Sequence, residues 1–176
     1  MIFRGRVPEE TVWRRFRSPV DPFTFARRDD ALFEAHVAAN AERIVELFYT
    51  LIDHLSPAVD VALEDKRSHR AWRGAHAAMP DVRDAIARMK VSLATYGGVE
   101  FSIYSSDDQL TLTPQLELYI YARSDRWLYL LQGMGLEESP TVPDKRWRRH
   151  PWDRTPAPVL TEAVVAAALR LSLEPA

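Results

Sequence analysis

The sequence predicts an α+β fold, in which an antiparallel β-meander of about three to five strands packs against three or four helices. Apolar and polar residues alternate in short runs between residues 96 and 135, which is typical of strands with one buried face. Before and after this stretch, apolar residues recur every three or four positions, as in amphipathic helices. Of the 176 residues, 47% are hydrophobic, enough to fill the core of one domain. We therefore expect a single α+β domain over residues 29–176, preceded by an N-terminal arm over residues 1–28.

The arm is basic and is expected to be extended. It contains seven arginines and three acidic residues, a local charge of +4, and its three prolines prevent a long helix. Its five aromatic residues are too many for a solvated tail, so we expect part of the arm to pack along the domain.

Residues 29–55 are predicted to form one long helix. Asp29 and Asp30 supply carboxylates of the kind that accept hydrogen bonds from the N–H groups at a helix N-terminus. From Phe33 to Leu55, apolar residues recur at steps of three and four, which places them on one continuous stripe.

Three shorter elements are expected between this helix and the meander. Alternation over residues 58–64 predicts a strand that joins the sheet, and residues 66–78 predict a short helix. A clearer helix begins at Pro80 and ends at Gly97-Gly98, because glycine adopts the left-handed conformation that ends many helices.

The meander is predicted to bury one face of its strands. Its inward side chains are Val99, Phe101, Ile103, Leu116, Leu118 and Ile120. Pro114 cannot donate to a β-ladder, so we expect a bulge, a break or an edge position there. The alternation of aromatic and aliphatic residues from Trp127 to Leu130 is interpreted as a further strand.

The composition changes after the meander. Residues 139–158 contain five prolines and a charge of +3, which predicts an extended connection rich in Pro, Arg and Trp. Residues 160–173 predict a closing helix. The residues outside the arm and this connection carry a charge of −9, so basic segments flank an acidic body.

Several classes of function are disfavoured by composition. The chain has no cysteine, which excludes disulfides, thiolate catalysis and cysteine-based metal centres. Its five histidines are not at metal-binding spacing, and no phosphate-binding, nucleophile-elbow or zinc-protease motif is present, so we expect no metal, no cofactor and no catalytic residues. No apolar run is long enough for a membrane span or signal peptide, which predicts a cytoplasmic protein.

Arginine recurs beside tryptophan in three places, which gives the first set of candidate binding residues. They are Trp13, Arg14, Arg15, Trp72, Arg146, Trp147, Arg148, Arg149 and Trp152. Guanidinium groups bind phosphates and indoles stack on nucleobases, so these clusters could hold nucleic acid or a nucleotide. The alternative is that basic segments lie across the acidic body, with their tryptophans as anchors.

The second candidate is the face of the meander opposite the buried one, which carries Tyr104, Tyr119 and Tyr121. Either helices and the two extended segments cover this face, or it is an aromatic surface for a protein partner or a second copy of the chain. A small-molecule pocket beside the sheet is a further alternative.

The sequence favours a non-enzymatic protein-interaction module that binds a macromolecular partner through the aromatic sheet face or the Arg/Trp clusters. A nucleic-acid or nucleotide-binding protein is the first alternative. A small-molecule enzyme is the second, and its ionisable candidates are Asp107, Glu117, Tyr119, Tyr121 and His150. The formal net charge of −2 gives no overall attraction to nucleic acid or to an anionic membrane.

Overall fold

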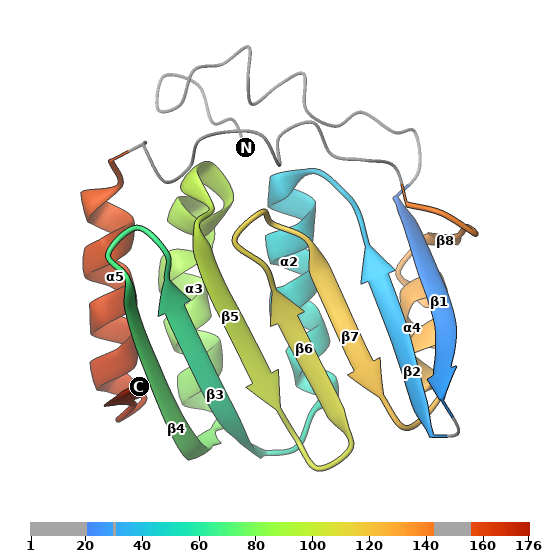
Figure 1. Ribbon diagram of the computed structural model, residues 1–176, viewed down its shortest axis with the longest axis horizontal. Coiled ribbons are helices and arrows are strands. Elements are labelled where there is room, and N and C mark those ends of the chain that lie inside the picture. The colour runs from blue at the N-terminus through green and yellow to red at the C-terminus, as the bar shows by residue number, and fades with distance from the viewer. Residues whose placement is uncertain (1–20, 30, 143–155) are drawn as a thin grey trace.

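The structure is a computed structural model that describes residues 21–29, 31–142 and 156–176. It confirms the α+β class: four α-helices and a nine-stranded mixed sheet are present in the described ranges (Figure 1). No helix in these ranges is both long enough and apolar enough to cross a bilayer. In chain order the elements are β1 (Pro22–Asp29), β2 (Leu32–Val37), α2 (Ala41–Leu51), a 3-10 helix (Ile52–His54), β3 (Ala58–Asp65), β4 (Arg70–Ala78), α3 (Met79–Tyr96), β5 (Val99–Tyr104), β6 (Asp108–Leu112), β7 (Leu118–Ala122), α4 (Arg126–Gly133), β8 (Glu137–Glu138), α5 (Pro158–Arg170) and β9 (Glu174–Pro175).

The predicted meander forms the centre of a sheet that is larger than expected. The strand order is β8-β1-β2-β7-β6-β5-β3-β4-β9, so hairpin β1–β2 extends the meander on one side and hairpin β3–β4 extends it on the other. The prediction of about three to five strands was therefore too low. Every described pairing is antiparallel except that of β1 with β8.

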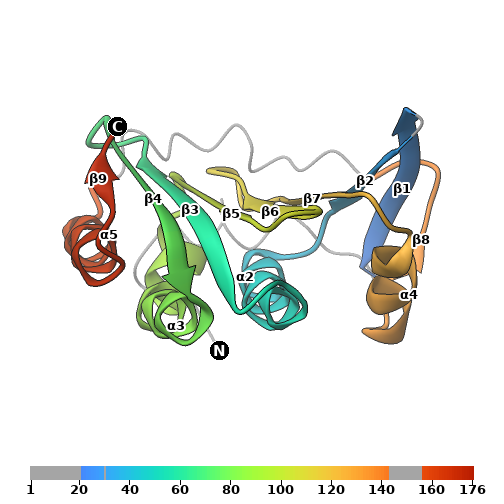
Figure 2. The same cartoon turned by 90° about the horizontal axis from the view of Figure 1, so that it is seen from below.

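All four α-helices lie on the same side of the sheet (Figure 2). The inward side chains of the central strands are fully buried against them, as the alternation predicts: Val99, Phe101, Ile103, Leu118 and Ile120 are at most 1% exposed. Period-two patterning thus decides which sheet face enters the core. The opposite face has no helix of the described residues over it.

The prediction of one long helix over residues 29–55 is wrong. Asp29 ends β1, and its carboxylate accepts a hydrogen bond from the Ala31 N–H in the turn to β2. The helix α2 begins only after Asn40, whose side chain accepts from the Arg43 N–H at 2.9 Å. The apolar pattern predicted a helix here because Phe33 and Val37 are four residues apart. This spacing fits one turn of a helix and also two repeats of a strand.

The short helix predicted over residues 66–78 is also wrong, because this segment forms β4 antiparallel to β3. A tight turn precedes β4 and places His69 at φ 53°. A bulge then interrupts the β3–β4 register, where His76 has φ 58° and its N–H donates to the Asp60 carboxylate at 3.0 Å. Such side chain to backbone hydrogen bonds stabilise turns and bulges that helix periodicity does not reveal.

The strand predicted around Trp127 is instead the helix α4, Arg126–Gly133. Trp127 and Leu131 are both fully buried and lie one helical turn apart, whereas Tyr129 is 64% exposed. A run with apolar residues at nearly every position fits both the strand period and the helix period. The burial of two residues spaced by four is typical of a helix.

Three other predicted elements are confirmed, whereas most of the predicted arm and of the connection over residues 139–158 lies outside the described residues. The strand at residues 58–64 is β3, which pairs with β4 and β5, and the helix begun near Pro80 is α3. The closing helix is α5, with Leu160, Val164, Ala167 and Ala168 buried. Pro114 lies in the connection between β6 and β7, as its missing N–H requires.

Gly97 ends α3 in a conformation that only glycine adopts readily, with φ 60° and ψ −157°. A Cβ at this position would stand 2.8 Å from the Pro114 carbonyl oxygen. The guanidinium of Arg67 adds hydrogen bonds to the carbonyls of Tyr96, at 2.7 Å, and of Gly97, which fixes this helix end against the β3–β4 turn.

We predict that Gly97→Ala lowers the free energy of unfolding by about 1–3 kcal/mol, because it combines backbone strain with a steric clash. Gly133→Ala is the matched control, since a Cβ there meets nothing within 4 Å and lies in a helix. The control should be neutral or should stabilise by about 0.5–1 kcal/mol. Urea denaturation of both variants measures the difference, and equal unfolding free energies would contradict the strained cap.

Candidate functional site

The sheet face turned away from the helices is called the open face below. The register of strands β2, β7, β6, β5 and β3 arranges its residues in rows across the sheet. One row joins His36, Tyr119, Thr111, Ser102 and Ala62, and the next joins Glu34, Tyr121, Gln109, Tyr104 and Asp60. Polar and aromatic side chains thus occupy the positions between the buried apolar ones.

Three rings form a stack at the β2–β7 side of the open face. The His36 imidazole lies parallel to the Tyr119 ring, with 4.2 Å between ring centroids, and Tyr119 is stacked on Tyr121 at 6.4 Å. Directly opposed residues on antiparallel strands have side chains close enough for such contacts. The stack gathers two phenol rings and an imidazole at one side of the open face.

Glu117 holds the imidazole in place. Its Oε1 lies 3.1 Å from Nε2 of His36, and only 6% of the Glu117 side chain is exposed. The preceding residue, Leu116, has φ 57°, which is strained for a bulky residue, and hydrogen bonds within the Thr113–Glu117 turn maintain this conformation. The turn between β6 and β7 therefore directs Glu117 to the ring stack.

Tyr121 lies next to a carboxylate and a guanidinium. Arg28 donates to Oε1 of Glu34 at 2.5 Å, and Glu34 is directly opposite Tyr121. Burial raises the pKa of the Tyr121 hydroxyl above its ordinary value, and the negative charge of Glu34 raises it further, while Arg28 acts in the opposite direction. Tyr121 is therefore a neutral hydroxyl, able to donate and accept, at neutral pH.

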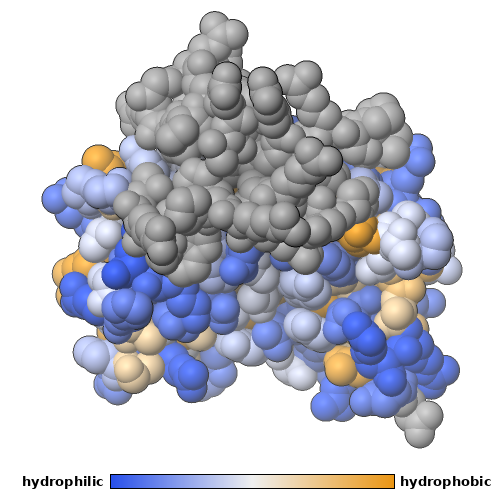
Figure 3. Space-filling view, turned by 45° about the horizontal axis from the view of Figure 1, so that its top comes forward, coloured by the Kyte–Doolittle hydropathy of each residue, from blue (hydrophilic) through white to orange (hydrophobic). Residues whose placement is uncertain are grey.

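The centre of the open face is polar and internally hydrogen-bonded. The hydroxyls of Ser102 and Thr111 are 2.9 Å apart, and Gln109 Nε2 donates to the same Thr111 oxygen at 3.0 Å. Tyr104 follows on β5 and is 37% exposed. The described residues on the side of the molecule shown in Figure 3 are mostly hydrophilic, with apolar residues scattered among them.

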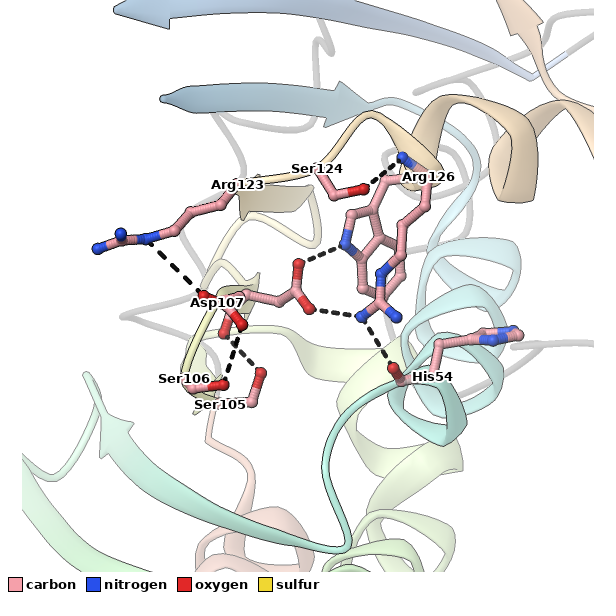
Figure 4. Close-up of polar contacts among 9 residues, drawn as sticks. His54, Ser105, Ser106, Asp107, Arg123, Ser124 and Arg126 are labelled. Carbon is pink, nitrogen blue, oxygen red and sulfur yellow. Dashed lines mark hydrogen bonds and ion pairs between the residues drawn. The ribbon is translucent and has the colours of Figure 1, made fainter. Parts of the chain in front are cut away.

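A second candidate site is a depression of about 600 Å³ where three connections meet at one end of the sheet. These connections follow α2, β5 and β7, and they contribute His54, Ser105, Ser106, Asp107, Arg123, Ser124 and Arg126 (Figure 4). Its volume suits a small ligand.

The charged groups of this depression are committed to one another. Asp108 is 8% exposed, and its carboxylate accepts from the Trp127 indole N–H at 2.8 Å and from Arg126 at 2.5 Å. The same Arg126 nitrogen donates to the His54 carbonyl at 2.9 Å. Asp107 is more exposed and lies 4.0 Å from Arg123. Asp108 therefore ties α4 to the β5–β6 turn and is a structural group.

The predicted site residues fall into three groups. Tyr104, Tyr119 and Tyr121 share the open face, as predicted. Trp72 is 6% exposed on β4, with the Arg70 guanidinium 4.8 Å from its ring centroid. The remainder lie outside the described residues, namely Trp13, Arg14, Arg15, Arg146, Trp147, Arg148, Arg149 and Trp152, together with His150.

Sequence reasoning missed three residues of the open face: Arg28, Glu34 and His36. All three were assigned to the arm or to the long helix. The sequence nevertheless contains the pattern of a strand, because apolar and polar residues alternate at every position from Phe33 to Val37.

The chain was compared with models of known protein families, with characterised proteins and with solved structures, and none of these matches it. Within the described residues, no group of three or more His, Asp and Glu side chains is arranged to hold a metal ion.

Proposed function

We propose that this protein is a non-enzymatic interaction module that binds a macromolecular partner through the open face of its sheet. One observation carries the proposal: an aromatic stack lies on a sheet face that no described helix covers. All four described α-helices pack on the opposite face. A sheet face that meets only water is typically polar, whereas here three rings gather at the β2–β7 side.

Tyrosine is suited to this role. It adds a large contact area at a low cost in conformational entropy, and its hydroxyl can bond to the partner. Here the tyrosines are already held by neighbours on adjacent strands, so little ordering is required when a partner binds.

The two alternatives find less support among the described residues. The open face carries more carboxylates than guanidinium groups, which disfavours a polyanion such as nucleic acid on this surface. For an enzyme, the His36–Glu117 pair is the strongest candidate. The nearest aliphatic hydroxyls in its row are those of Thr111 and Ser102, and these two bond to each other.

The proposal is tested by comparative affinity capture from the native lysate. The bait is the full chain, its Tyr119→Thr/Tyr121→Thr variant, or the Tyr129→Thr control, in which the exposed tyrosine of α4 is changed. Threonine keeps the β-propensity of β7. A partner that binds through the open face is recovered with the wild-type bait and with the control bait, and it is lost with the double variant. Recovery that is equal for all three baits would refute the proposal. Light scattering of the purified chain tells whether the partner is a second copy.

A further inference from the structure

We infer that the partner presents a basic, arginine- or lysine-rich segment to the β5–β3 side of the open face. This inference rests on the proposed function and specifies the chemistry of the partner. It follows from the distribution of charge on the face, from an unsatisfied carboxylate within it, and from the adjoining tyrosines.

The open face is acidic. Its strands and the β6–β7 turn direct five carboxylates to it, against three cationic groups, those of Arg28, Arg73 and Lys66. The carboxylates belong to Glu34, Asp60, Glu64, Glu100 and Glu117. Two of them form ion pairs within the face, Glu34 with Arg28 and Glu64 with Lys66, and Glu117 is bonded to His36. Among the described residues, the carboxylates without a cationic partner are those of Asp60 on β3 and Glu100 on β5.

Glu100 is the unusual residue of this group. It lies directly opposite Glu64 in the β3–β5 register, and its carboxylate has no hydrogen bond or ion pair with another described residue. Like charges directly opposed on neighbouring strands destabilise a sheet. Glu64 has Lys66 at 2.6 Å, which leaves the Glu100 charge uncompensated. A cation supplied by a partner would relieve this repulsion.

The tyrosines complete a surface suited to arginine and lysine. Tyr104 is on the same strand as Glu100 and on the same face, and the ring stack of Tyr119 and Tyr121 begins two strands away. Guanidinium and ammonium groups bind both to aromatic faces and to carboxylates. The same chain already uses this contact elsewhere, with Arg83 and Lys90 over the ring of Tyr49 at 4.4 and 4.3 Å.

The test is binding of a fluorescent peptide of about eight residues, alternating Arg and Ser, which spans several strands when extended. Its affinity for the full chain is measured by anisotropy in low salt, beside that of a Glu/Ser peptide. The variant is Glu64→Gln/Glu100→Gln. The control is Glu137→Gln/Glu162→Gln, which changes the net charge equally at two exposed positions on β8 and α5.

The expected result is that the basic peptide binds and the acidic one does not. We expect the affinity to fall about tenfold or more in the sheet variant, to change less than about twofold in the control, and to decrease with added salt. The sheet variant removes a repulsive pair and also the Glu64–Lys66 ion pair, so its unfolding free energy should stay close to that of wild type. Urea denaturation of the variant shows that lost binding is not caused by unfolding.

Three outcomes overturn the inference. One is equal loss of affinity in both variants, which would show attraction to net charge alone. Another is absence of peptide binding, together with a carbodiimide cross-link between Glu100 and a basic residue of the same chain, which would show that the protein covers this face itself. Failure of the peptide while the double tyrosine variant still loses its captured partner would leave the proposed function intact and refute only the basic chemistry.

Discussion

Replacing Trp127 with alanine is expected to lower the free energy of unfolding by about 3–5 kcal/mol, the largest effect of any single change considered. Trp127 is fully buried, and its removal leaves a cavity under α4. It also removes the indole N–H that bonds to the Asp108 carboxylate at 2.8 Å, which leaves a buried acceptor with one donor fewer. Urea denaturation of the purified variant measures the loss.

The control for this prediction lies two residues further along the same helix. Tyr129→Ala removes an aromatic ring that is 64% exposed, so its unfolding free energy should stay within about 0.5 kcal/mol of wild type. Trp127→Phe separates the effect of the lost side-chain volume from that of the lost hydrogen bond. This variant keeps a buried aromatic ring and loses the indole N–H and part of the buried area. Similar losses for Trp127→Ala and Tyr129→Ala would contradict the burial of Trp127.

The second large effect concerns binding. The Tyr119→Thr/Tyr121→Thr variant is expected to lose about 2–4 kcal/mol of binding free energy for the captured partner, or about 30- to 1000-fold in affinity. The reason is that two adjacent, preorganised rings are removed together, and buried tyrosines contribute much of the affinity at many interfaces. Titration calorimetry with the purified partner gives the number.

Two measurements make this result specific to the open face. Tyr129→Thr should bind the partner as wild type does, because its ring lies on α4, on the other side of the sheet. Circular dichroism and denaturation of the double variant show whether the sheet remains folded. A folded double variant with unchanged affinity would place the binding surface elsewhere.

The central meander could be predicted because its strands alternate strictly and are separated by residues that favour turns. Phe101 and Ile103, for example, lie on one face under any register that keeps period two. The same pattern predicted that Tyr119 and Tyr121 share the other face, and the stacked rings agree with this.

The flanking hairpins could not be predicted, because their sequences fit two periodicities. Phe33 and Val37 satisfy the helical spacing as well as the strand spacing, and only pairing with β1 and β7 decides between them. In β4, the bulge at His76 depends on a hydrogen bond to Asp60, sixteen residues earlier. Such long-range pairing is absent from any local window of sequence, and with β2 misassigned, His36 could not be placed beside Glu117.

The central claim is that the open face is the surface that meets the partner, and site-specific photo-cross-linking tests it most directly. Benzoylphenylalanine replaces Tyr121 in one full-length protein and Tyr129 in another, and both are irradiated in the native lysate. We expect a discrete cross-linked adduct from position 121 and none from position 129. An adduct from position 129 alone, or from neither position while the partner is still captured, would contradict it.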